Sequence, residues 1–330
     1  MVTTGTELPK LPPPGSPAVP VWPGEHVTAG RYRLFVRRTP SPPGAERAVF
    51  VHGLGGASTN WTDLMYLLAP RLAGEALDLP GFGWSDPPPD RDYRLGAHVR
   101  ATVAYLETTG RGPVHLFGNS LGGAVCIRLA ATRPDLVRTL TLVSPALPSL
   151  RPERPGDSQL LLLLLPGVDG IARRRLSRVD PETRARAVLD SCFHDLSRVP
   201  AGRLAEAARE VARREELHWT ADALLGSLRG LVAGYLRRGP GGLWACAARI
   251  SAPTLLVWGR HDRLVSVRLA ARANAVIRNS RLVVIEDGGH VSQLEHPQQV
   301  AQAVMDMLST AENAETPGGS PGVSAGTSVT

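Results

Sequence analysis

Short apolar runs alternate with helix-patterned segments along most of the chain, and this alternation limits the possible folds more than any other feature. The runs are β-branched or apolar and have the length of buried strands. The predicted strands are Arg31–Val36, Arg47–Val51, Glu75–Leu79, Val114–Phe117, Thr139–Val143, Thr254–Trp258 and Leu282–Ile285. The predicted helices are Asn60–Leu68, Leu95–Glu107, Leu121–Thr132, Val267–Val276 and Pro297–Leu308. This order favours an α/β fold, a mostly parallel doubly wound sheet with helices on both faces.

The alternation stops between residues 146 and 249. This stretch has almost no β-branched runs, and its Arg and Ala residues recur at helical spacing in Pro181–Leu189, Gly202–Arg214 and Ala221–Leu236. We therefore expect a helical cap at 146–249, inserted into one α/β core made of residues 29–145 and 250–310. Residues 1–28 are rich in Pro and residues 311–330 in Gly, Ser, Thr and Pro, so we expect both ends to be disordered tails.

The charge balance suggests a nucleic-acid partner, but the type and distribution of the cations argue against it. The chain has 37 Lys and Arg against 30 Asp and Glu, a formal charge of +7, and Lys10 is the single lysine. The arginines are spread along the whole chain rather than clustered on one segment. We therefore expect no nucleic-acid partner.

Neither the cysteines nor the apolar runs suggest secretion or a membrane span. Cys126, Cys192 and Cys246 are widely spaced, which favours three reduced thiols and no metal site. The run Leu160–Leu165 ends at Pro166, far short of a spanning helix. The first residues also lack a charged segment followed by an apolar one. These features predict a cytoplasmic protein with no membrane span, and they leave the oligomeric state open.

The strongest motif is Gly118-Asn119-Ser120-Leu121-Gly122-Gly123, which lies between a predicted strand and a predicted helix. A G-x-S-x-G string in that context makes a sharp turn with a strained serine at its tip. The two flanking glycines are needed because a Cβ there would collide with the neighbouring strand or helix. The turn would hold Ser120 at the carboxyl end of the sheet, where open α/β folds bind ligands. An ordinary Gly-rich turn is the alternative.

Two further residues could complete a nucleophilic site around Ser120. A catalytic serine needs a base to take its proton and an acid to orient that base. Asp262 and His290 each follow a predicted strand, so both could meet Ser120 at the same edge. Asp262 could instead cap a turn, and His290 could lie on a surface loop. We interpret Glu286 and Asp287 as solvated carboxylates at a strand end.

Acyl transfer also requires two donors for the oxyanion of the tetrahedral intermediate. The backbone N–H of Leu121 lies at the start of a helix, where negative charge is stabilised. The second donor would be the N–H of Leu54, in the loop His52-Gly53-Leu54-Gly55-Gly56 after a predicted strand. A simple Gly-rich turn is the alternative for this loop. A phosphate-binding loop is disfavoured because no Gly-Lys-Ser/Thr ending follows.

Together these segments resemble the α/β-hydrolase superfamily, in its serine-nucleophile branch with a helical cap after the sixth strand. The segments that carry the resemblance are His52–Gly56, Asp78–Asp86, Gly118–Gly123, Gly259–Asp262 and Gly289–His290. The resemblance implies a Ser120, Asp262, His290 triad with Leu54 and Leu121 as oxyanion donors and no cofactor or metal. It argues against the subgroups with an aspartate nucleophile. Some of these segments are also similar to those of C–C bond hydrolases. In that subgroup an aromatic residue often follows the catalytic histidine, whereas this chain has Val291.

The sequence thus predicts hydrolysis of a carboxylic ester or similar acyl compound through a covalent acyl-enzyme. The alternatives are a C–C bond hydrolase of ring-cleavage products and a non-catalytic binder of small ligands on the same fold. The substrate would be a small apolar molecule held beneath the cap. The candidate pocket residues are His52, Leu160–Leu165, Trp219, Leu224, Leu225, Leu228 and Trp244.

Overall fold

The structure is a computed structural model that describes residues 8–12, 18–40, 42–110, 112–149 and 179–315. Its centre is a single eight-stranded sheet with the order β1-β2-β4-β3-β5-β6-β7-β8. The strands are β1 (Gly24–Ala29), β2 (Tyr32–Arg38), β3 (Glu46–Val51), β4 (Leu72–Leu77), β5 (Val114–Asn119), β6 (Val137–Val143), β7 (Thr254–Gly259) and β8 (Ser280–Ile285). The pairs β1–β2 and β2–β4 are antiparallel and all other pairs are parallel. The predicted α/β class and mostly parallel sheet are confirmed.

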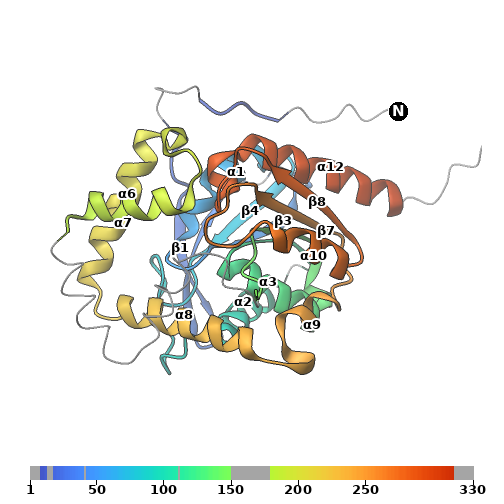
Figure 1. The fold of residues 1–330 in the computed structure, drawn as a ribbon, viewed down its shortest axis with the longest axis horizontal. Coiled ribbons are helices and arrows are strands. Elements are labelled where there is room, and N and C mark those ends of the chain that lie inside the picture. Colours follow the sequence, from blue (N-terminus) through green and yellow to red (C-terminus); the bar gives the residue numbers. More distant parts are fainter. Residues whose placement is uncertain (1–7, 13–17, 41, 111, 150–178, 316–330) are drawn as a thin grey trace, which may run out of the picture.

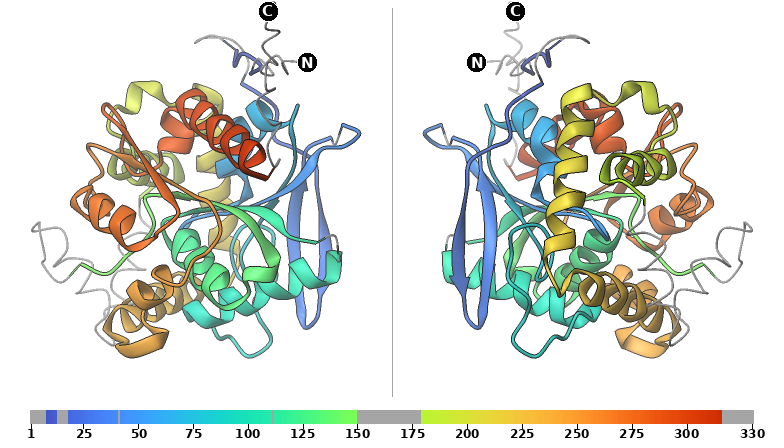
Figure 2. Two further views of the ribbon diagram at one scale, coloured as in Figure 1. Left: turned by 90° about the vertical axis from the view of Figure 1, so that its right-hand side faces the viewer. Right: turned by 90° about the vertical axis from the view of Figure 1, so that its left-hand side faces the viewer.

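Helices cover both faces of the sheet, as Figures 1 and 2 show. One face carries α1 (Thr62–Leu68) and α12 (Pro297–Glu315), which pack on Phe50, Phe117 and Val257 from the central strands. The other face carries α2 (Leu95–Thr109), α3 (Leu121–Thr132), α9 (Leu243–Ala247) and α10 (Arg268–Val276). Strands β3, β5 and β7 are buried almost along their whole length, because both of their faces are covered.

The described part of the predicted cap is helical. It contains α6 (Pro181–Cys192), α7 (Ala201–Glu216) and α8 (Thr220–Leu236), which lie to one side of the sheet in Figure 1. Helices α6 and α7 pack against each other. The short helix α9 belongs to the same sequence interval but packs on α3 of the core, because its Leu243, Cys246 and Ala247 are buried there. The predicted run Leu160–Leu165 lies outside the described residues.

Two predicted boundaries are wrong. The disordered N-terminal tail was expected to reach residue 28, but β1 begins at Gly24 and pairs with β2 through six residues. The C-terminal tail was expected from residue 311, but α12 continues to Glu315. At the N-terminal boundary, the pairing of β1 with β2 supplies backbone hydrogen bonds that an isolated polar segment lacks. Val19, which precedes β1, is also buried. Within the described residues, no helix is long and apolar enough to cross a membrane.

Candidate active site

Ser120 lies at a sharp turn between β5 and α3, and its backbone is strained. Its φ of 51° and ψ of −115° fall in a region that side-chain-bearing residues rarely adopt. Three hydrogen bonds hold this conformation. The Ser120 N–H donates to the Val143 carbonyl at 3.1 Å, and the Ser120 carbonyl accepts from the N–H groups of Ala124 and Ala146 at 3.0 and 2.9 Å. The surrounding chain therefore fixes the direction in which the Ser120 side chain leaves the sheet.

The glycines beside Ser120 are required by close packing. A Cβ on Gly118 would lie 2.6 Å from the Gly122 carbonyl oxygen, and a Cβ on Gly122 would lie 2.2 Å from the carbonyl oxygen of Val51 in β3. Both distances are far below a normal contact, and both neighbours are rigid backbone atoms. The turn can therefore pack against β3 only when these positions carry no side chain.

His290 and Asp262 form a buried hydrogen-bonded pair. Asp262 follows β7 and His290 follows β8, and the His290 Nδ1 lies 2.9 and 3.1 Å from the two carboxylate oxygens. The Asp262 Oδ1 also accepts from the N–H groups of Leu264 and Val265, each at 2.8 Å. Burial alone would raise the pKa of Asp262, but its pairing with His290 and these hydrogen bonds hold it below its usual range. An ionised Asp262 fixes the proton on Nδ1 and leaves Nε2 as the acceptor.

Glu286 and Asp287 lie nearer to His290 in sequence but pair with other residues. Glu286 binds Arg260, with an Oε1 to Nη2 distance of 2.6 Å, and Asp287 binds Arg198 at 2.6 Å. Both carboxylates are at least half exposed. The structure thus brings Asp262, and not Asp287, to the imidazole. Asp262 also caps the turn after β7. The residue therefore both binds the imidazole and caps a turn, which were the two alternatives predicted for it.

The loop after β3 carries Leu54, and His52 holds its first peptide unit. The buried His52 accepts the Leu79 N–H on Nε2 at 2.9 Å, so its Nδ1 bears the proton and donates to the Gly53 carbonyl at 2.7 Å. The Gly56 N–H donates to the same carbonyl at 3.0 Å. In a trans peptide the C=O and the following N–H point in opposite directions, so these contacts orient the N–H of Leu54. Burial lowers the pKa of His52, which keeps this imidazole neutral.

A cavity of about 740 Å³ contains Ser120, Asp262 and His290 in its lining. Leu54 and Asn119 line it as well, and Leu121 is the first residue of α3, where its N–H has no carbonyl one turn earlier in the helix. The apolar wall comes from the cap and the core and includes Leu147, Ala185, Val188, Leu189, Leu224, Leu228, Leu231, Val232, Tyr235, Val265, Leu269, Val291 and Leu294. The structure therefore places a nucleophile candidate and a base candidate in one largely apolar space.

The family of the chain follows from comparison with known proteins. A model of the alpha/beta hydrolase fold family matches residues 49–297, which include the Ser120 turn, the cap helices and both residues of the His290–Asp262 pair. The chain belongs to this family. Within the α/β-hydrolase fold, these three residues occupy the carboxyl ends of β5, β7 and β8, where the sequence predicted them.

Among its relatives, this α/β-hydrolase is 29% identical over 270 residues to a 2-hydroxy-6-oxononadienedioate/2-hydroxy-6-oxononatrienedioate hydrolase from Pseudomonas putida, covering 80% of this chain and 88% of that protein. It is 30% identical to the dihydrolipoyllysine-residue acetyltransferase component of the acetoin cleaving system of Cupriavidus necator, covering 82% and 67%. The solved structure of a 2-hydroxy-6-oxo-6-phenylhexa-2,4-dienoate hydrolase from Rhodococcus superposes with a TM-score of 0.71 at 21% identity, covering 87% of this chain and 98% of that one.

Four of the predicted pocket residues of the hydrolase lie elsewhere. Leu224 and Leu228 line the cavity, but His52, Leu225, Trp219 and Trp244 do not. His52 is fully buried against the loop that it holds. The Trp244 indole N–H donates to the Pro148 carbonyl at 3.0 Å and its ring stacks under Arg272, while Trp219 begins α8 with its ring against His218. Neither indole is part of the described cavity lining.

The loop that carries His290 is held by residues that no sequence motif marks. The buried Glu295 accepts the N–H of Gly289 at 2.6 Å and those of His194 and Asp195 at 3.2 and 2.8 Å. The His290 N–H itself donates to the carbonyl of Cys192, the last residue of α6, at 2.7 Å. These contacts tie the histidine to the start of the cap. No spacing in the sequence signals the contacts with the cap, because their partners are about 100 residues apart.

Two of the three arginines in the described cavity lining pair with carboxylates of the same wall. Arg203 binds Asp63 at 2.5 Å and Glu206 at 2.8 Å, and Arg214 binds Glu210 at 2.9 Å. Each of these guanidinium groups thus has a carboxylate partner within the same wall. Along the described residues, the wall therefore combines an apolar surface with these ion pairs and with Arg263, whose nearest carboxylate is that of Asp190 at 3.9 Å.

Proposed function

We propose that the chain is a serine hydrolase that cleaves an apolar acyl compound through a covalent acyl-enzyme. The observation that carries this proposal is the buried Asp262–His290 pair, which shares one cavity with the strained Ser120. A binder of small ligands would need a cavity, but it would have no use for an acid and a base arranged beside a strained serine. Ser120 is the proposed nucleophile, His290 the general base and then acid, and Asp262 the residue that orients the imidazole.

The proposed reaction has two halves. His290 Nε2 takes the proton of the Ser120 hydroxyl while its oxygen attacks the substrate carbonyl carbon, and the N–H groups of Leu54 and Leu121 receive the oxyanion. The intermediate collapses with loss of the leaving group, which takes the proton from His290. Water then gives a proton to His290 and attacks the acyl carbon, and the second collapse frees the acid and restores the Ser120 hydroxyl.

For the substrate we propose an uncharged carboxylic ester. The apolar wall of the cavity comes from the cap helices and the core, and it suits an aliphatic or aromatic acyl group. The wall cations Arg203 and Arg214 are already neutralised by Asp63, Glu206 and Glu210. An anionic substrate would have to compete with these carboxylates, which favours a neutral one.

Hydrolysis of a C–C bond is the second candidate. It is favoured by the names of several relatives, which are hydrolases of 2-hydroxy-6-oxononadienedioate, at 27–29% identity. The two candidates differ in the bond that is broken and share Ser120, Asp262 and His290. Rates with a series of nitrophenyl esters and with a 2-hydroxy-6-oxo-dienoate separate them. A kcat/KM at least tenfold higher for the dienoate would replace the ester proposal with the C–C one.

The nucleophile assignment is tested with the variant Ser120→Ala. We expect its ester turnover to fall by about 10⁴-fold or more, because the hydroxyl that forms the acyl-enzyme is gone. A fluorophosphonate probe should label the wild type and fail to label this variant. The control is Ser197→Ala, whose hydroxyl binds Asp195 on an exposed turn. Equal turnover by wild type and Ser120→Ala, or persistent labelling of the variant, would contradict the proposal.

A further inference from the structure

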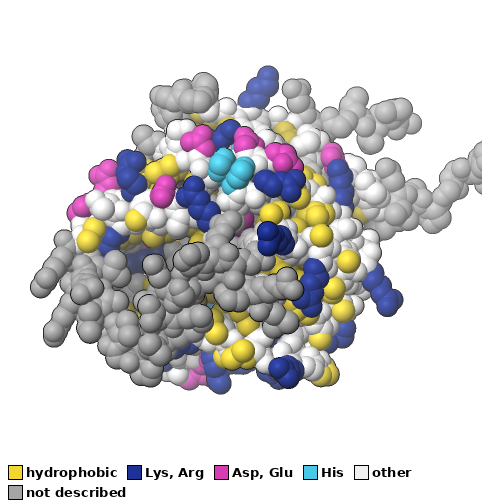
Figure 3. Space-filling model, in the orientation of Figure 1, with side chains coloured by type: hydrophobic (Ala, Val, Ile, Leu, Met, Phe, Trp, Pro, Cys, Tyr) yellow, Lys and Arg dark blue, Asp and Glu magenta, His cyan; other side chains and the backbone are white. Residues whose placement is uncertain are grey.

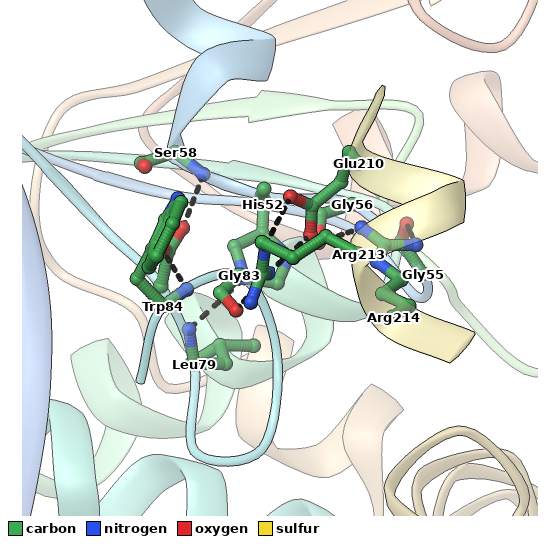
Figure 4. A network of polar contacts seen from close by, with 12 residues as sticks. His52, Gly55, Gly56, Ser58, Leu79, Gly83, Trp84, Glu210, Arg213 and Arg214 are labelled. Atoms are coloured by element: carbon green, nitrogen blue, oxygen red, sulfur yellow. Dashed lines mark hydrogen bonds and ion pairs between the residues drawn. The ribbon is translucent and has the colours of Figure 1, made fainter. Parts of the chain in front are cut away.

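The last turn of the cap helix α7 carries two adjacent arginines that share one carboxylate. Arg213 and Arg214 both bind Glu210, with Nη2 and Nε to Oε1 distances of 2.8 and 2.9 Å. Apart from Glu210, the two arginines have different partners, as Figure 4 shows. Arg213 donates to the Gly83 carbonyl and stacks over the Trp84 ring, with its guanidinium carbon 4.4 Å from the ring centre. Arg214 instead reaches the loop after β3.

Arg214 binds two consecutive carbonyl groups of that loop. Its Nη1 donates to the Gly55 carbonyl at 2.6 Å, and its Nη2 donates to the Gly56 carbonyl at 3.1 Å. The Arg214 side chain is only 20% exposed. Hydrogen bonds from a charged donor are stronger than those between neutral groups, more so away from water. A cap residue therefore holds the backbone immediately after Leu54 by hydrogen bonds to two carbonyl groups.

The loop requires such hydrogen bonds because its glycine residues allow the backbone many conformations. Gly53, Gly55 and Gly56 surround Leu54, and glycine loses more conformational entropy on ordering than any other residue. Gly55 has a φ of 69°, in the left-handed region. From the core side, His52 fixes the Gly53 carbonyl. From the cap side, Arg214 fixes the next two carbonyls, so the Leu54 N–H lies between two anchored stretches of backbone.

The guanidinium is poorly suited to a direct role in substrate binding. Each of its three nitrogen atoms already donates to a protein oxygen, those of Glu210, Gly55 and Gly56. Burial would raise the pKa of Glu210, but the two arginines hold it below its usual range, so the carboxylate stays charged and keeps Arg214 in place. The fork geometry of arginine lets one side chain hold two carbonyls and a carboxylate together, which lysine cannot do.

We propose that Arg214 is a positioning residue that makes formation of the oxyanion hole depend on the cap. It acts through the loop Gly53–Gly56, whose Leu54 N–H is one of the two oxyanion donors, and in this respect it rests on the proposed function. When α7 is seated, Arg214 anchors the loop and the Leu54 N–H is directed at the developing oxyanion. When the contact is lost, the glycine loop samples other conformations and acylation slows.

The test compares Arg214→Gln with Arg213→Gln in the full chain. Both variants remove one Glu210 ion pair and one contact between cap and core, but only the first releases the oxyanion loop. For Arg214→Gln we expect the acylation rate, measured as the stopped-flow burst from a nitrophenyl ester, to fall about tenfold to a hundredfold. This is less than the roughly 10²–10³-fold effect of deleting an oxyanion donor. Arg213→Gln should stay within threefold of wild type, and Arg214→Lys, which keeps the charge, should lie between.

Two further readouts separate positioning from a general structural role. The affinity of Arg214→Gln for a trifluoromethyl ketone, which forms a tetrahedral adduct, should fall by the same factor as acylation, while its affinity for the product acid stays within threefold. Hydrogen exchange of the backbone at residues 53–57 should be faster in Arg214→Gln than in Arg213→Gln. This last measurement requires no turnover.

The outcomes are distinguishable. Acylation by Arg214→Gln at the rate of Arg213→Gln would overturn the proposal, whatever the exchange shows. A loss confined to KM for esters that carry a carboxylate would also overturn it, because Arg214 would then be a contact for a substrate anion. If the wild type hydrolysed no ester and no dienoate, the proposed function would fail. The exchange at residues 53–57 would then decide the positioning role alone, faster exchange supporting it and equal exchange rejecting it.

Discussion

At the residue scale, Ser120 stores backbone strain that the neighbouring chain maintains. A residue other than glycine in such a conformation costs about 1–3 kcal/mol. The hydrogen bonds to Val143, Ala124 and Ala146 offset that cost, and the close approach to Val51 leaves the turn no room to relax. The serine is thus held in position before any substrate arrives, which reduces the reorganisation needed for attack.

The pairing of His290 with Asp262 predicts which carboxylate matters for the reaction. Asp262→Asn should lower kcat by about 10⁴-fold, because the amide no longer holds the imidazole tautomer with its proton on Nδ1. Asp287→Asn should leave kcat within threefold, because Asp287 is half exposed and binds Arg198. Steady-state ester hydrolysis measures both. Loss of activity in Asp287→Asn with retention in Asp262→Asn would reverse the assignment.

The individual residues also show what a sequence can reveal. The shared location of Ser120, Asp262 and His290 could be predicted because each follows a strand at the same edge of a parallel sheet. The contacts of Glu295 and Arg214 between cap and core could not, because those partners lie about 100 residues or more away and only the folded chain brings them together. The tryptophans were misassigned since an apolar residue on a cap helix can face either the cavity or the core, and spacing alone does not distinguish these sides.

At the element scale, α8 is fastened to the core by very close contacts with α2 and the loop before it. A Cβ on Gly230 would lie 2.6 Å from the Arg94 Cα, and the buried His98 Nε2 lies 2.8 Å from the Ser227 Oγ. The glycines let the two segments approach, and the buried pair fixes their register. This interface couples the stability of the cap to that of the core.

His98 makes that interface sensitive to acid. Burial lowers the pKa of His98 to about 3, whereas an exposed histidine titrates near 6.5. Between these values the unfolded chain binds a proton that the folded chain does not, so the free energy of unfolding decreases as the pH falls. In His98→Gln the slope of unfolding free energy against pH should be shallower by ~1.4 kcal/mol per pH unit in this window.

Urea denaturation between pH 4 and pH 6.5 measures the slope, and Ser227→Ala is the matched control. It removes the hydrogen-bond partner but keeps the titrating group, so it should lower stability and retain the wild-type slope. An unchanged slope in His98→Gln would show that this histidine is not the source of the acid sensitivity.

Among the elements, the seven predicted strands and five predicted core helices are present, with ends that shift by a few residues. Strand β1 could not be predicted because it is an edge strand whose side chains are mostly exposed. It therefore lacks the apolar run by which the other strands are recognised in the sequence. Its stability comes from pairing with β2, a contact that the local sequence does not encode. The extension of α12 to Glu315 was missed for a similar reason, since its last turns are polar.

At the scale of the whole molecule, the positive charge of the described residues is distributed, and many of their arginines are paired. Many surface arginines bind a neighbouring carboxylate, among them Arg33 with Asp86, Arg133 with Asp135 and Arg260 with Glu286. In Figure 3 the Lys and Arg side chains on the visible face are scattered among acidic and apolar ones. A surface of this kind offers few adjacent cations to a phosphate backbone.

Binding to DNA should accordingly be weak and only slightly dependent on salt. We expect the logarithm of the affinity for duplex DNA to fall with the logarithm of salt concentration with a slope of magnitude below about 2, which corresponds to about two phosphate contacts. Fluorescence anisotropy over a salt series measures this slope. A magnitude of about 5 or more would reveal a cationic surface that the pairing of the arginines does not suggest.

The attachment of the His290 loop to the end of α6 bears on how this molecule can be redesigned. Exchanging the caps of two α/β proteins as cassettes assumes that the core keeps its own geometry. Here Cys192, His194 and Asp195 supply backbone partners to His290 and Glu295. A chimera joined downstream of Asp195 retains these partners. A chimera that replaces them must supply new backbone contacts for the His290 loop as well as the new specificity.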